Sequence, residues 1–449
     1  MTKMKPVAVA LLALGVSSFS AVTTASEVDD RIAALERQLA ELKAQIASNK
    51  ETIIVHTEVI DANAAEIEEA RPARKGTKFQ YGGFIQLDAL ATDYAEGKPG
   101  NNLIEDFLVP SLIPVEPASG GADSYSSLNI HAKSSRFYFT TKTETDAGAI
   151  STRVELDFML SPGGDERISN SWNSRIRHAF VKWDYDEGSS LMAGQSWSTF
   201  FNVSALPDVL DFVGPVGTIF IRQPQIRWTS GGLQLAVENP ATRLNESIAG
   251  GNTTRLDDSE TIPDLIARYN GKAGELSWSV AGMARQLSYD DRSGGNSYEI
   301  DSDTEYGYGL SLAGKWKLGK DDFRFMFNYG SALGRYLGLN SYNDGYIDAN
   351  GDIDTIDQWG ALAAYQHYWT PHWRSTFSVS ASGADNPSSK EYVSAENLAK
   401  SYQSVHANLN WLPAPRLQLG GELIYGYKEM EDGREGSLSR LQFAVKYAL

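Results

Sequence analysis

Six basic residues lie in segments where polar and apolar side chains alternate, and together they could bind an anion. They are Arg136, Lys142, Arg153, Arg177, Arg222 and Arg227. A planar guanidinium binds a carboxylate through two parallel hydrogen bonds, and a ring of basic groups around a passage makes it prefer anions. The same arginines could instead form structural ion pairs with Glu155 or Asp157, and the sequence leaves both possibilities open.

A second candidate is a calcium site in one acidic loop. Residues with oxygen-bearing side chains alternate with others there, as in calcium-binding loops: Asp348, Asn350, Asp352 and Asp354. Gly351 precedes the third acid instead of following it, and Trp359 stands where the closing glutamate belongs. The pattern therefore favours a solvated acidic loop, and we expect no metal.

The histidines give no sign of a catalytic site. They are not grouped with a serine, as a nucleophile and its base would be: His56, His131, His178, His367, His372 and His406. We therefore expect neither an enzyme nor a bound cofactor.

Composition and charge exclude several classes of protein. The chain has 449 residues, no cysteine and 57 acidic against 40 basic residues, a net charge of −17. Without cysteine there are no disulfides, thiolate zinc sites or cysteine nucleophiles. The negative charge argues against a nucleic-acid partner. After the first twenty-odd residues no apolar run is long enough for a spanning helix, which excludes a helical membrane protein but not a membrane barrel.

The N-terminus has the layout of a secretory signal. Lys3 and Lys5 precede an apolar core from Val7 to Val16, and small residues follow up to Ala25. We expect residues 1–25 to be a signal peptide that is removed on export.

Residues 26–71 carry a heptad repeat. Isoleucine or leucine occupies every a position from Ile32 to Ile67, whereas the later d positions are polar. Polar residues in such a seam fix register and oligomeric state, and isoleucine-rich seams favour more than two strands. The pattern predicts a parallel trimeric coiled coil, with Ile46, Asn49, Ile53, His56, Ile60 and Asn63 at its centre, and a linker over 72–78.

From Phe79 to Leu449 the repeat changes to a period of two. In the last strand Leu441, Phe443 and Val445 alternate with polar or small residues. We count sixteen such segments, separated alternately by tight turns and by long polar loops. This is the pattern of an all-β, antiparallel transmembrane barrel whose sixteen strands enclose an aqueous lumen.

The tryptophans support a membrane location. Most of them lie within a few residues of a predicted short turn, as an aromatic belt at a membrane boundary would: Trp183, Trp228, Trp278, Trp316, Trp369, Trp373 and Trp411. Both ends of the barrel then lie on the short-turn side, which places the coiled coil in the periplasm of a Gram-negative bacterium.

Three segments resemble the DcaP-like outer-membrane porins. They are residues 177–183 (RHAFVKW), 191–200 (LMAGQSWSTF) and 220–228 (FIRQPQIRW). The resemblance covers the whole mature chain, coiled coil included. It implies a homotrimeric porin in outer-membrane lipid and lipopolysaccharide that favours small anionic solutes, particularly dicarboxylates. The last residue, Leu449, departs from the aromatic residue that usually ends such barrels.

The third long loop, Phe201–Val216, is the candidate constriction, since the third long loop of general porins folds into the lumen. It is richer in apolar residues than the other long loops and contains Pro207, Asp208, Asp211 and Phe212. We expect the two aspartates to lie near the solute path, across from the basic residues. The alternative is an ordinary loop at the surface.

Strand parity divides the basic residues. It points Arg136, Lys142, Arg153 and Arg227 into the lumen. It is ambiguous for Arg177, which shares its parity with Trp183, and Arg222 has the parity of apolar residues near the outer end of its strand.

Other functions remain open at this point. The protein could instead be a sugar-selective or a non-specific porin. A sugar channel should show a line of aromatic side chains along the lumen, whereas the inward faces carry mostly Gln, Ser and Arg. A structural tether between periplasm and outer membrane would use the coiled coil but not the inward loop.

Overall fold

The computed structural model describes residues 39–40, 43 and 76–449, apart from 161–168, 249–250 and 291–301. The predicted signal peptide lies outside the described residues, and so do the coiled-coil positions Ile46, Asn49, Ile53, His56, Ile60 and Asn63. The calcium candidate and all predicted pore residues lie within them. No helix in the described part has the length and apolar character needed to span a membrane.

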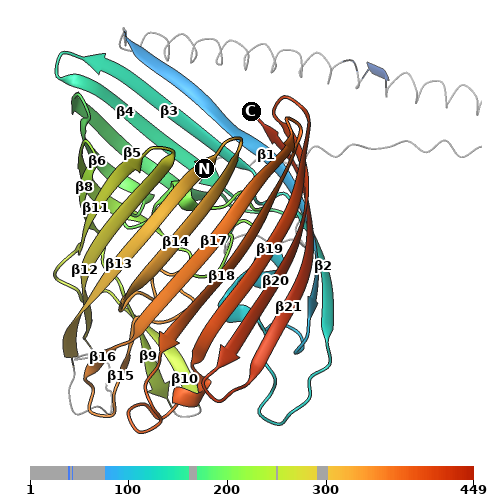
Figure 1. Cartoon of the computed structure of the whole chain (residues 1–449), viewed down its shortest axis with the longest axis vertical. Helices are drawn as coiled ribbons and strands as arrows, with labels where there is room; N and C mark the ends of the chain where they lie inside the picture. The colour runs from blue at the N-terminus through green and yellow to red at the C-terminus, as the bar shows by residue number, and fades with distance from the viewer. Residues whose placement is uncertain (1–38, 41–42, 44–75, 161–168, 249–250, 291–301) are drawn as a thin grey trace, which may run out of the picture. The chain divides into compact units, whose positions relative to one another are not determined.

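Residues 76–449 form a closed antiparallel barrel (Figure 1). Its strands are β1 (Thr77–Tyr94), β2 (Tyr125–His131), β3 (Arg136–Thr145), β4 (Gly148–Asp157), β5 (Arg175–Asp186), β6 (Ser189–Trp197), β7 (Arg222–Ser230), β8 (Leu233–Glu238), β11 (Asp264–Ala273), β12 (Leu276–Asp290), β13 (Ser302–Leu318), β14 (Asp321–Ser331), β17 (Asp357–Thr370), β18 (Trp373–Asp385), β19 (Ala399–Ala414), β20 (Leu417–Met430) and β21 (Glu435–Ala448).

The barrel has the predicted sixteen strands. β2 and β3 both pair with β1 and are two halves of one strand, interrupted at 132–135. β21 pairs antiparallel with β1 along most of its length and closes the sheet. This closure pairs the first and last strands of the sheet with each other, as a structure within hydrocarbon requires. The sixteen-stranded antiparallel fold is therefore confirmed, with its first strand beginning at Thr77 instead of Phe79.

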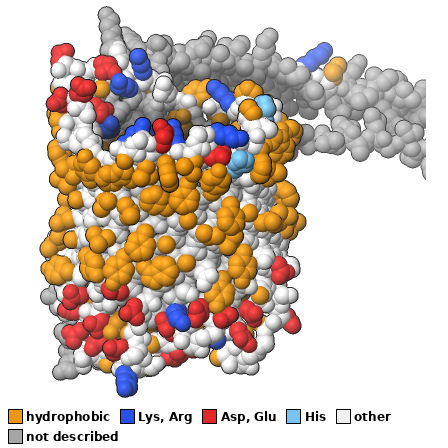
Figure 2. All heavy atoms as spheres, viewed as in Figure 1, with side chains coloured by type: hydrophobic (Ala, Val, Ile, Leu, Met, Phe, Trp, Pro, Cys, Tyr) orange, Lys and Arg blue, Asp and Glu red, His pale blue; other side chains and the backbone are white. Residues whose placement is uncertain are grey.

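Polar and apolar side chains alternate along the strands, which explains how a chain with many polar residues can form the wall of a membrane barrel. On β21, Arg440 and Gln442 are each only 2% exposed, whereas Leu441 and Phe443 are 37% and 54% exposed. The first pair faces the lumen and the second faces outward. Figure 2 shows the result as a broad apolar band across the visible outer face of the barrel.

The two ends of the barrel differ. Short turns such as Asp146–Ala147 and Gly231–Gly232 join strands at the end where the barrel begins and finishes, at the top of Figure 1. Exposed tryptophans gather near these turns, and Trp373 and Trp411 stack with ring centroids 5.6 Å apart. Long loops join the strands at the other end.

The long-loop end contains a small sheet that the sequence did not predict. β9 (Thr242–Ile248) and β10 (Gly251–Asp257) pair with β15 (Gly345–Ile347) and β16 (Ile353–Thr355) in one four-stranded sheet. These residues were expected to be polar loops only. The remaining short elements are α2 (Leu103–Asp106), η1 (Pro110–Leu112), η2 (Val203–Ala205) and η3 (Ala395–Asn397).

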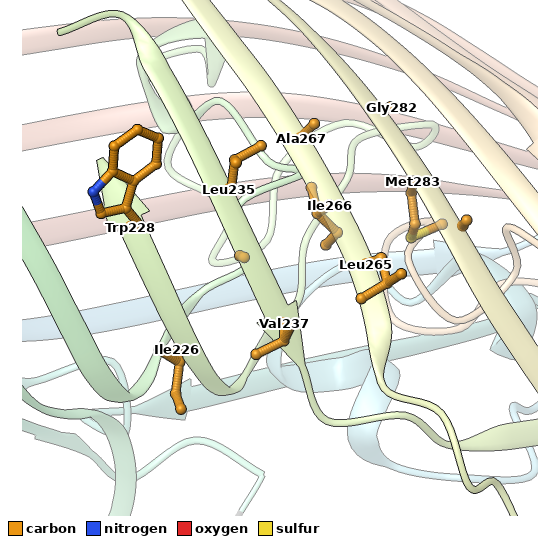
Figure 3. Close-up of a pocket in the computed structure, with 11 residues that line it drawn as sticks. Ile226, Trp228, Leu235, Val237, Leu265, Ile266, Ala267, Gly282 and Met283 are labelled. Atoms are coloured by element: carbon orange, nitrogen blue, oxygen red, sulfur yellow. The ribbon is translucent and has the colours of Figure 1, made fainter. Parts of the chain in front are cut away.

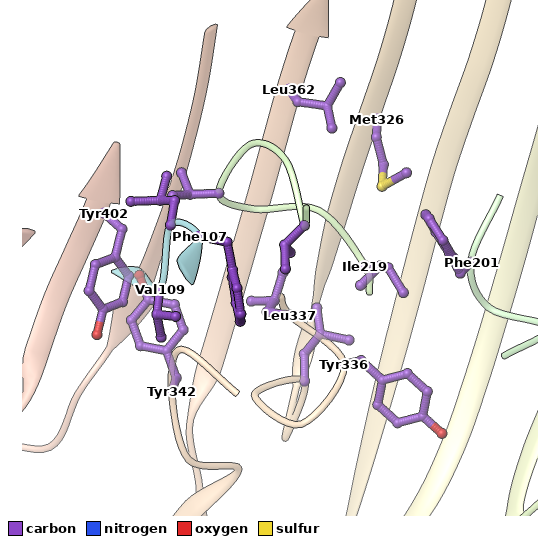
Figure 4. Close-up of a cluster of buried hydrophobic side chains, with 14 of the residues drawn as sticks. Phe107, Val109, Phe201, Ile219, Met326, Tyr336, Leu337, Tyr342, Leu362 and Tyr402 are labelled. Carbon is purple, nitrogen blue, oxygen red and sulfur yellow. The ribbon is translucent and has the colours of Figure 1, made fainter. Parts of the chain in front are cut away.

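Three long loops fold inward and meet in one apolar cluster, which we call the inner cluster (Figure 4). The loop after β1 contributes Phe107 and Val109, the loop after β6 contributes Phe201 and Ile219, and the loop after β14 contributes Tyr336. Wall residues such as Met326, Leu362 and Tyr402 pack against them. Burial of this much apolar surface holds the loops inside the barrel.

Candidate solute-binding site in the lumen

The loop between β6 and β7, residues 198–221, lies across the lumen. The backbone N–H of Leu210 donates to the Glu422 carboxylate on β20 at 2.6 Å, and that of Val216 donates to the Ser404 hydroxyl on β19 at 3.2 Å. Asn328 on β14 donates to the Gly217 carbonyl at 3.0 Å. A loop that starts on one side of the barrel is thus fastened to the opposite wall.

Asp211 shapes this loop and does not face the basic residues, which corrects our expectation. One carboxylate oxygen accepts from the Leu108 N–H at 2.7 Å, and the other accepts from the N–H groups of Val213 and Gly214 at 3.1 and 3.0 Å. Burial raises the pKa of the Asp211 carboxyl, and the charges of His406 and Arg440 oppose that shift. A carboxylate so occupied joins two loops and is not available to a solute.

Asp208 reaches the wall opposite the predicted basic residues. Its carboxylate accepts from Arg374 on β18 at 2.7 Å and from Gln366 on β17 at 2.8 Å. Phe212 of the same loop points the other way: its ring lies 5.6 Å from that of Phe107 and 5.4 Å from the guanidinium carbon of Arg177. Phe212, rather than Asp208 or Asp211, is therefore the loop residue that contacts Arg177.

Five arginines gather around two buried carboxylates on β3 to β7; we call Arg136, Arg153, Arg175, Arg177 and Arg222 the arginine cluster. Glu155 accepts from Arg177 at 2.8 Å and forms ion pairs with Arg153 at 2.5 Å and Arg136 at 3.4 Å. Asp157 accepts from Arg175 and Arg177, both at 2.6 Å. The ion pairs that the sequence left open thus exist, but the cations outnumber the carboxylates.

Arg222 is the member without a counter-ion in the described part of the chain. Its guanidinium lies 4.2 Å above the Trp197 ring, and its buried Nη1 has no hydrogen-bond partner there. A guanidinium over an indole is attracted to the ring face. Stacking holds the side chain in place while leaving its charge unneutralised, which is the arrangement that an anion would meet.

A β-bulge explains the ambiguous parity of Arg177. His178 pairs with Glu155, but Ile176 pairs with Leu156, so Arg177 is an extra residue on β5. An extra residue reverses the alternation of the strand. Arg175 and Arg177 can therefore face the lumen while Trp183 on the same strand faces outward.

Lys142 and Arg227 lie apart from the cluster, contrary to expectation. Lys142 is exposed near a short turn and forms an ion pair with Glu144 at 2.6 Å. Arg227 donates to Thr199 at 2.8 Å, to the Gln225 amide oxygen at 2.7 Å and to the Trp197 carbonyl. Arg227 therefore fastens the beginning of the loop between β6 and β7, which we call the inward loop. The charge of Arg227 is buried in that contact.

A second basic group was missed from the sequence. Lys446 on β21 lies 4.0 Å from the centroid of the Phe84 ring, which Arg136 also approaches at 5.1 Å. Both line a cavity of about 170 Å³ between the wall and the inward loop, with Asp208 and Gln418. The alternation of the last strand could have found Lys446, because it shares its parity with Arg440 and Gln442.

The acidic loop predicted as a weak calcium candidate uses its first carboxylate internally. One oxygen of Asp348 accepts from the N–H groups of Asn350, Gly351 and Asp352 at 2.8 to 2.9 Å. Among the described residues there is no group of three or more His, Cys, Asp or Glu that could hold a metal ion.

One apolar hollow on the middle strands lies on the outer wall and not in the lumen. It has a volume of about 600 Å³ and is lined by outward residues of β7, β8, β11 and β12, including Ile226, Trp228, Leu235 and Leu265 (Figure 3). Side chains of this kind face lipid in a membrane barrel. The hollow therefore belongs to the lipid-facing surface.

The comparisons with known proteins agree on the fold. The crystal structure of the outer membrane channel DcaP of Acinetobacter baumannii superposes with a TM-score of 0.66 at 21% identity, covering 84% of this chain and 99% of that one. OmpF of Salmonella typhi, in complex with daunomycin, matches with a TM-score of 0.50 at 10% identity, covering 84% and 99%. No curated protein matches by sequence.

A family model gives a more specific assignment. The model described as DcaP outer membrane protein matches residues 19–449, which include the whole barrel and the stretch before it. The resemblance seen in the three segments of β5 to β7 is thereby confirmed over nearly the full chain. This protein belongs to the DcaP outer membrane protein family.

Proposed function

We propose that this protein is a channel through which small anionic solutes diffuse, with a preference for dicarboxylates. The observation that carries the proposal is the unneutralised charge of Arg222 within the arginine cluster, beside a loop that narrows the lumen. The similar protein from Acinetobacter baumannii is an outer membrane channel, which supports a channel here but not a particular solute.

The net charge of −17 does not oppose an anion channel. In a narrow passage with low-dielectric walls, nearby fixed charges dominate the local field. Figure 2 shows Lys and Arg side chains at the hollow of the short-turn end, among some Asp and Glu side chains, whereas Asp and Glu side chains predominate at the opposite end.

Two basic groups favour a solute with two carboxylates. One is the arginine cluster, and the other is Lys446, which lines the cavity of about 170 Å³ beside the loop together with the cluster residue Arg136. A dicarboxylate can contact both, whereas a monocarboxylate contacts one. Glu155 and Asp157 hold the guanidiniums in place and compete for them, which keeps binding weak enough for the solute to leave.

A reversal potential tests the proposal. The protein is placed in a planar bilayer under a potassium chloride gradient. We expect the reversal potential to be displaced from zero towards the equilibrium potential of chloride. Replacing chloride by succinate on one side should keep an anion current, whereas sucrose should only lower conductance by crowding the lumen. A reversal potential displaced towards the equilibrium potential of potassium would contradict the proposal.

We also propose that three chains assemble through the coiled coil of residues 26–71 in the periplasm, with the outer walls in lipid and lipopolysaccharide. The heptad seam with its polar d positions supports a trimer. Light scattering of the detergent-solubilised full chain should give the mass of three copies. Removal of residues 26–71 should make that assembly dissociate at lower temperature, and a full chain that stays monomeric would rule out the trimer.

A further inference from the structure

A polar cavity at the long-loop end is built from four separate parts of the chain. Its volume is about 250 Å³. Ser111 comes from the loop after β1, Arg243 from β9, Ser341 from the loop after β14 and Leu398 from the loop after β18. Since these segments are far apart in sequence, the cavity depends on the folded arrangement of the loops and is not a gap within one loop.

Asparagine dominates the lining of this cavity, which we call the asparagine pocket. It contains Asn245, Asn252, Asn340, Asn343, Asn386 and Asn397, and no carboxylate is among its described lining residues. An asparagine amide offers both donors and an acceptor. Such a wall matches the hydroxyl groups of a polar solute better than it matches an apolar ligand.

Several of these amides are already held in place. The Asn343 amide donates to Asn245 at 2.8 Å and to Thr254 at 3.0 Å, and Asn386 donates to the Ala399 carbonyl at 2.9 Å. The amide oxygens of Asn343 and Asn386 are left as acceptors in the described part of the chain. The side chain of Asn340 has no hydrogen-bond partner among the described residues. Part of the wall is therefore rigid and part is unsatisfied.

Arg243 adds a positive charge without a counter-ion. Its guanidinium has no ion pair in the described part of the chain, and its Nε is buried with no hydrogen-bond partner. The carboxylate of Asp344 is nearby and attracts this charge, but it forms no ion pair with Arg243: one of its oxygens accepts from Arg285 at 2.7 Å and from the Arg335 N–H at 2.9 Å, and the other has no hydrogen-bond partner in the described part of the chain. The side chain of Arg243 is half-buried, and leaving its buried Nε–H donor without an acceptor is costly unless an anion satisfies it.

We propose that the asparagine pocket binds a small carboxylate that also carries several hydroxyl groups, with the carboxylate on Arg243 and the hydroxyls on the asparagines. With a volume of about 250 Å³, the cavity has room for a sugar acid or a smaller hydroxy acid. The inference deepens the proposed function, because the bound solutes would be ones that the channel carries, met at the end opposite the short turns.

The two halves of the pocket together give the specificity. A neutral polyol leaves the Arg243 guanidinium without an anion, and acetate leaves the amides without hydroxyl partners. Sorbitol and acetate should therefore each bind more weakly than gluconate, which presents both chemical groups.

Calorimetry with the full chain in detergent tests this, with gluconate, sorbitol and acetate as probes. Arg243→Gln should weaken gluconate binding at least tenfold, because it removes charge-assisted hydrogen bonds. Asn340→Gly should weaken it less and keeps the left-handed backbone, with φ of 53°, that Asn340 adopts. Lys390→Gln removes one charge from an exposed position at the same end and should bind as the unchanged protein does. Retained heat-modifiable migration on gels checks that each variant is folded.

The outcomes separate this inference from the proposed function. Equal gluconate affinity in the Arg243→Gln variant, or sorbitol binding as tight as gluconate binding, would overturn the pocket. If gluconate binding is lost only when Arg153 and Arg222 are replaced, the pocket fails and the anion channel stands. If binding depends on Arg243 while the reversal potential shows no anion preference, the pocket stands and the channel proposal fails.

Discussion

Replacing both Arg153 and Arg222 by glutamine is expected to lower the ratio of chloride to potassium permeability by about tenfold. Two unit charges about 8 Å apart interact by roughly 0.5 kcal/mol in bulk water and roughly 2 kcal/mol at an effective dielectric constant of ~20. A narrowed lumen lies between these limits, so the loss of two charges weakens anion binding by about 1.4 kcal/mol, which corresponds to a factor of ten. The reversal potential of single variants and of the double variant in a salt gradient measures the ratio.

Arg222→Gln should account for most of that change. Glu155 partly neutralises Arg153 at 2.5 Å, whereas no described carboxylate forms an ion pair with Arg222. Glu155 keeps Arg136 and Arg177 as partners when Arg153 is removed, so no buried carboxylate is left alone. Lys142→Gln is the matched control: it removes the same charge at an exposed position paired with Glu144 and should change the ratio little. An unchanged ratio in the folded double variant would show that the cluster is structural only.

The barrel could be predicted because a repeat of two residues is a local property. On β21 the alternation alone tells which side chains face lipid and which face the lumen, and every strand adds the same kind of information. An extra residue in a strand makes this prediction fail for the residues on one side of it. The bulge at Arg177 reverses the parity of β5, and no local pattern marks it, since its position depends on pairing with Glu155 and Leu156 across the sheet.

The roles of the loop residues could be predicted only in part. The apolar residues of the loop between β6 and β7 indicated that it folds inward. They did not indicate which carboxylate would accept hydrogen bonds from the backbone of the loop. Asp211 is engaged by two N–H groups of its own loop and one from Leu108, which is 103 residues away in sequence. The asparagine pocket was missed for the same reason, because its lining residues come together only when four distant loops meet.

The inward loop and the arginine cluster depend on each other. Phe212 approaches the guanidinium carbons of Arg177 and Arg175 at 5.4 and 5.6 Å, so the loop bounds one side of the space beside the cluster. Arg227 fastens the beginning of the loop, and contacts with β14, β19 and β20 fasten its far side. Loop position should therefore control both conductance and selectivity.

Gly217→Val is expected to release the far side of the loop and to raise single-channel conductance several-fold, with a loss of anion preference. Gly217 has a φ of 70°, and a Cβ there would lie 2.5 Å from the Ala381 carbonyl oxygen and 2.9 Å from the Ala361 nitrogen. Both are backbone atoms of the wall, so the clash cannot be relieved by turning a side chain. Overpacking of this kind costs about 1–3 kcal/mol, which is enough to undock a loop without unfolding the barrel.

Gly214→Ala separates this effect from backbone strain. Gly214 also has a positive φ, of 94°, but a Cβ there would lie 3.4 Å from the nearest atom, a flexible methyl group of Val209. We expect Gly214→Ala to strain the loop locally while leaving it docked, with a conductance close to that of the unchanged protein. Single-channel recordings in symmetric potassium chloride compare the two variants. If both keep the original conductance, the loop does not limit the passage, and the solute path must be narrowest elsewhere in the lumen.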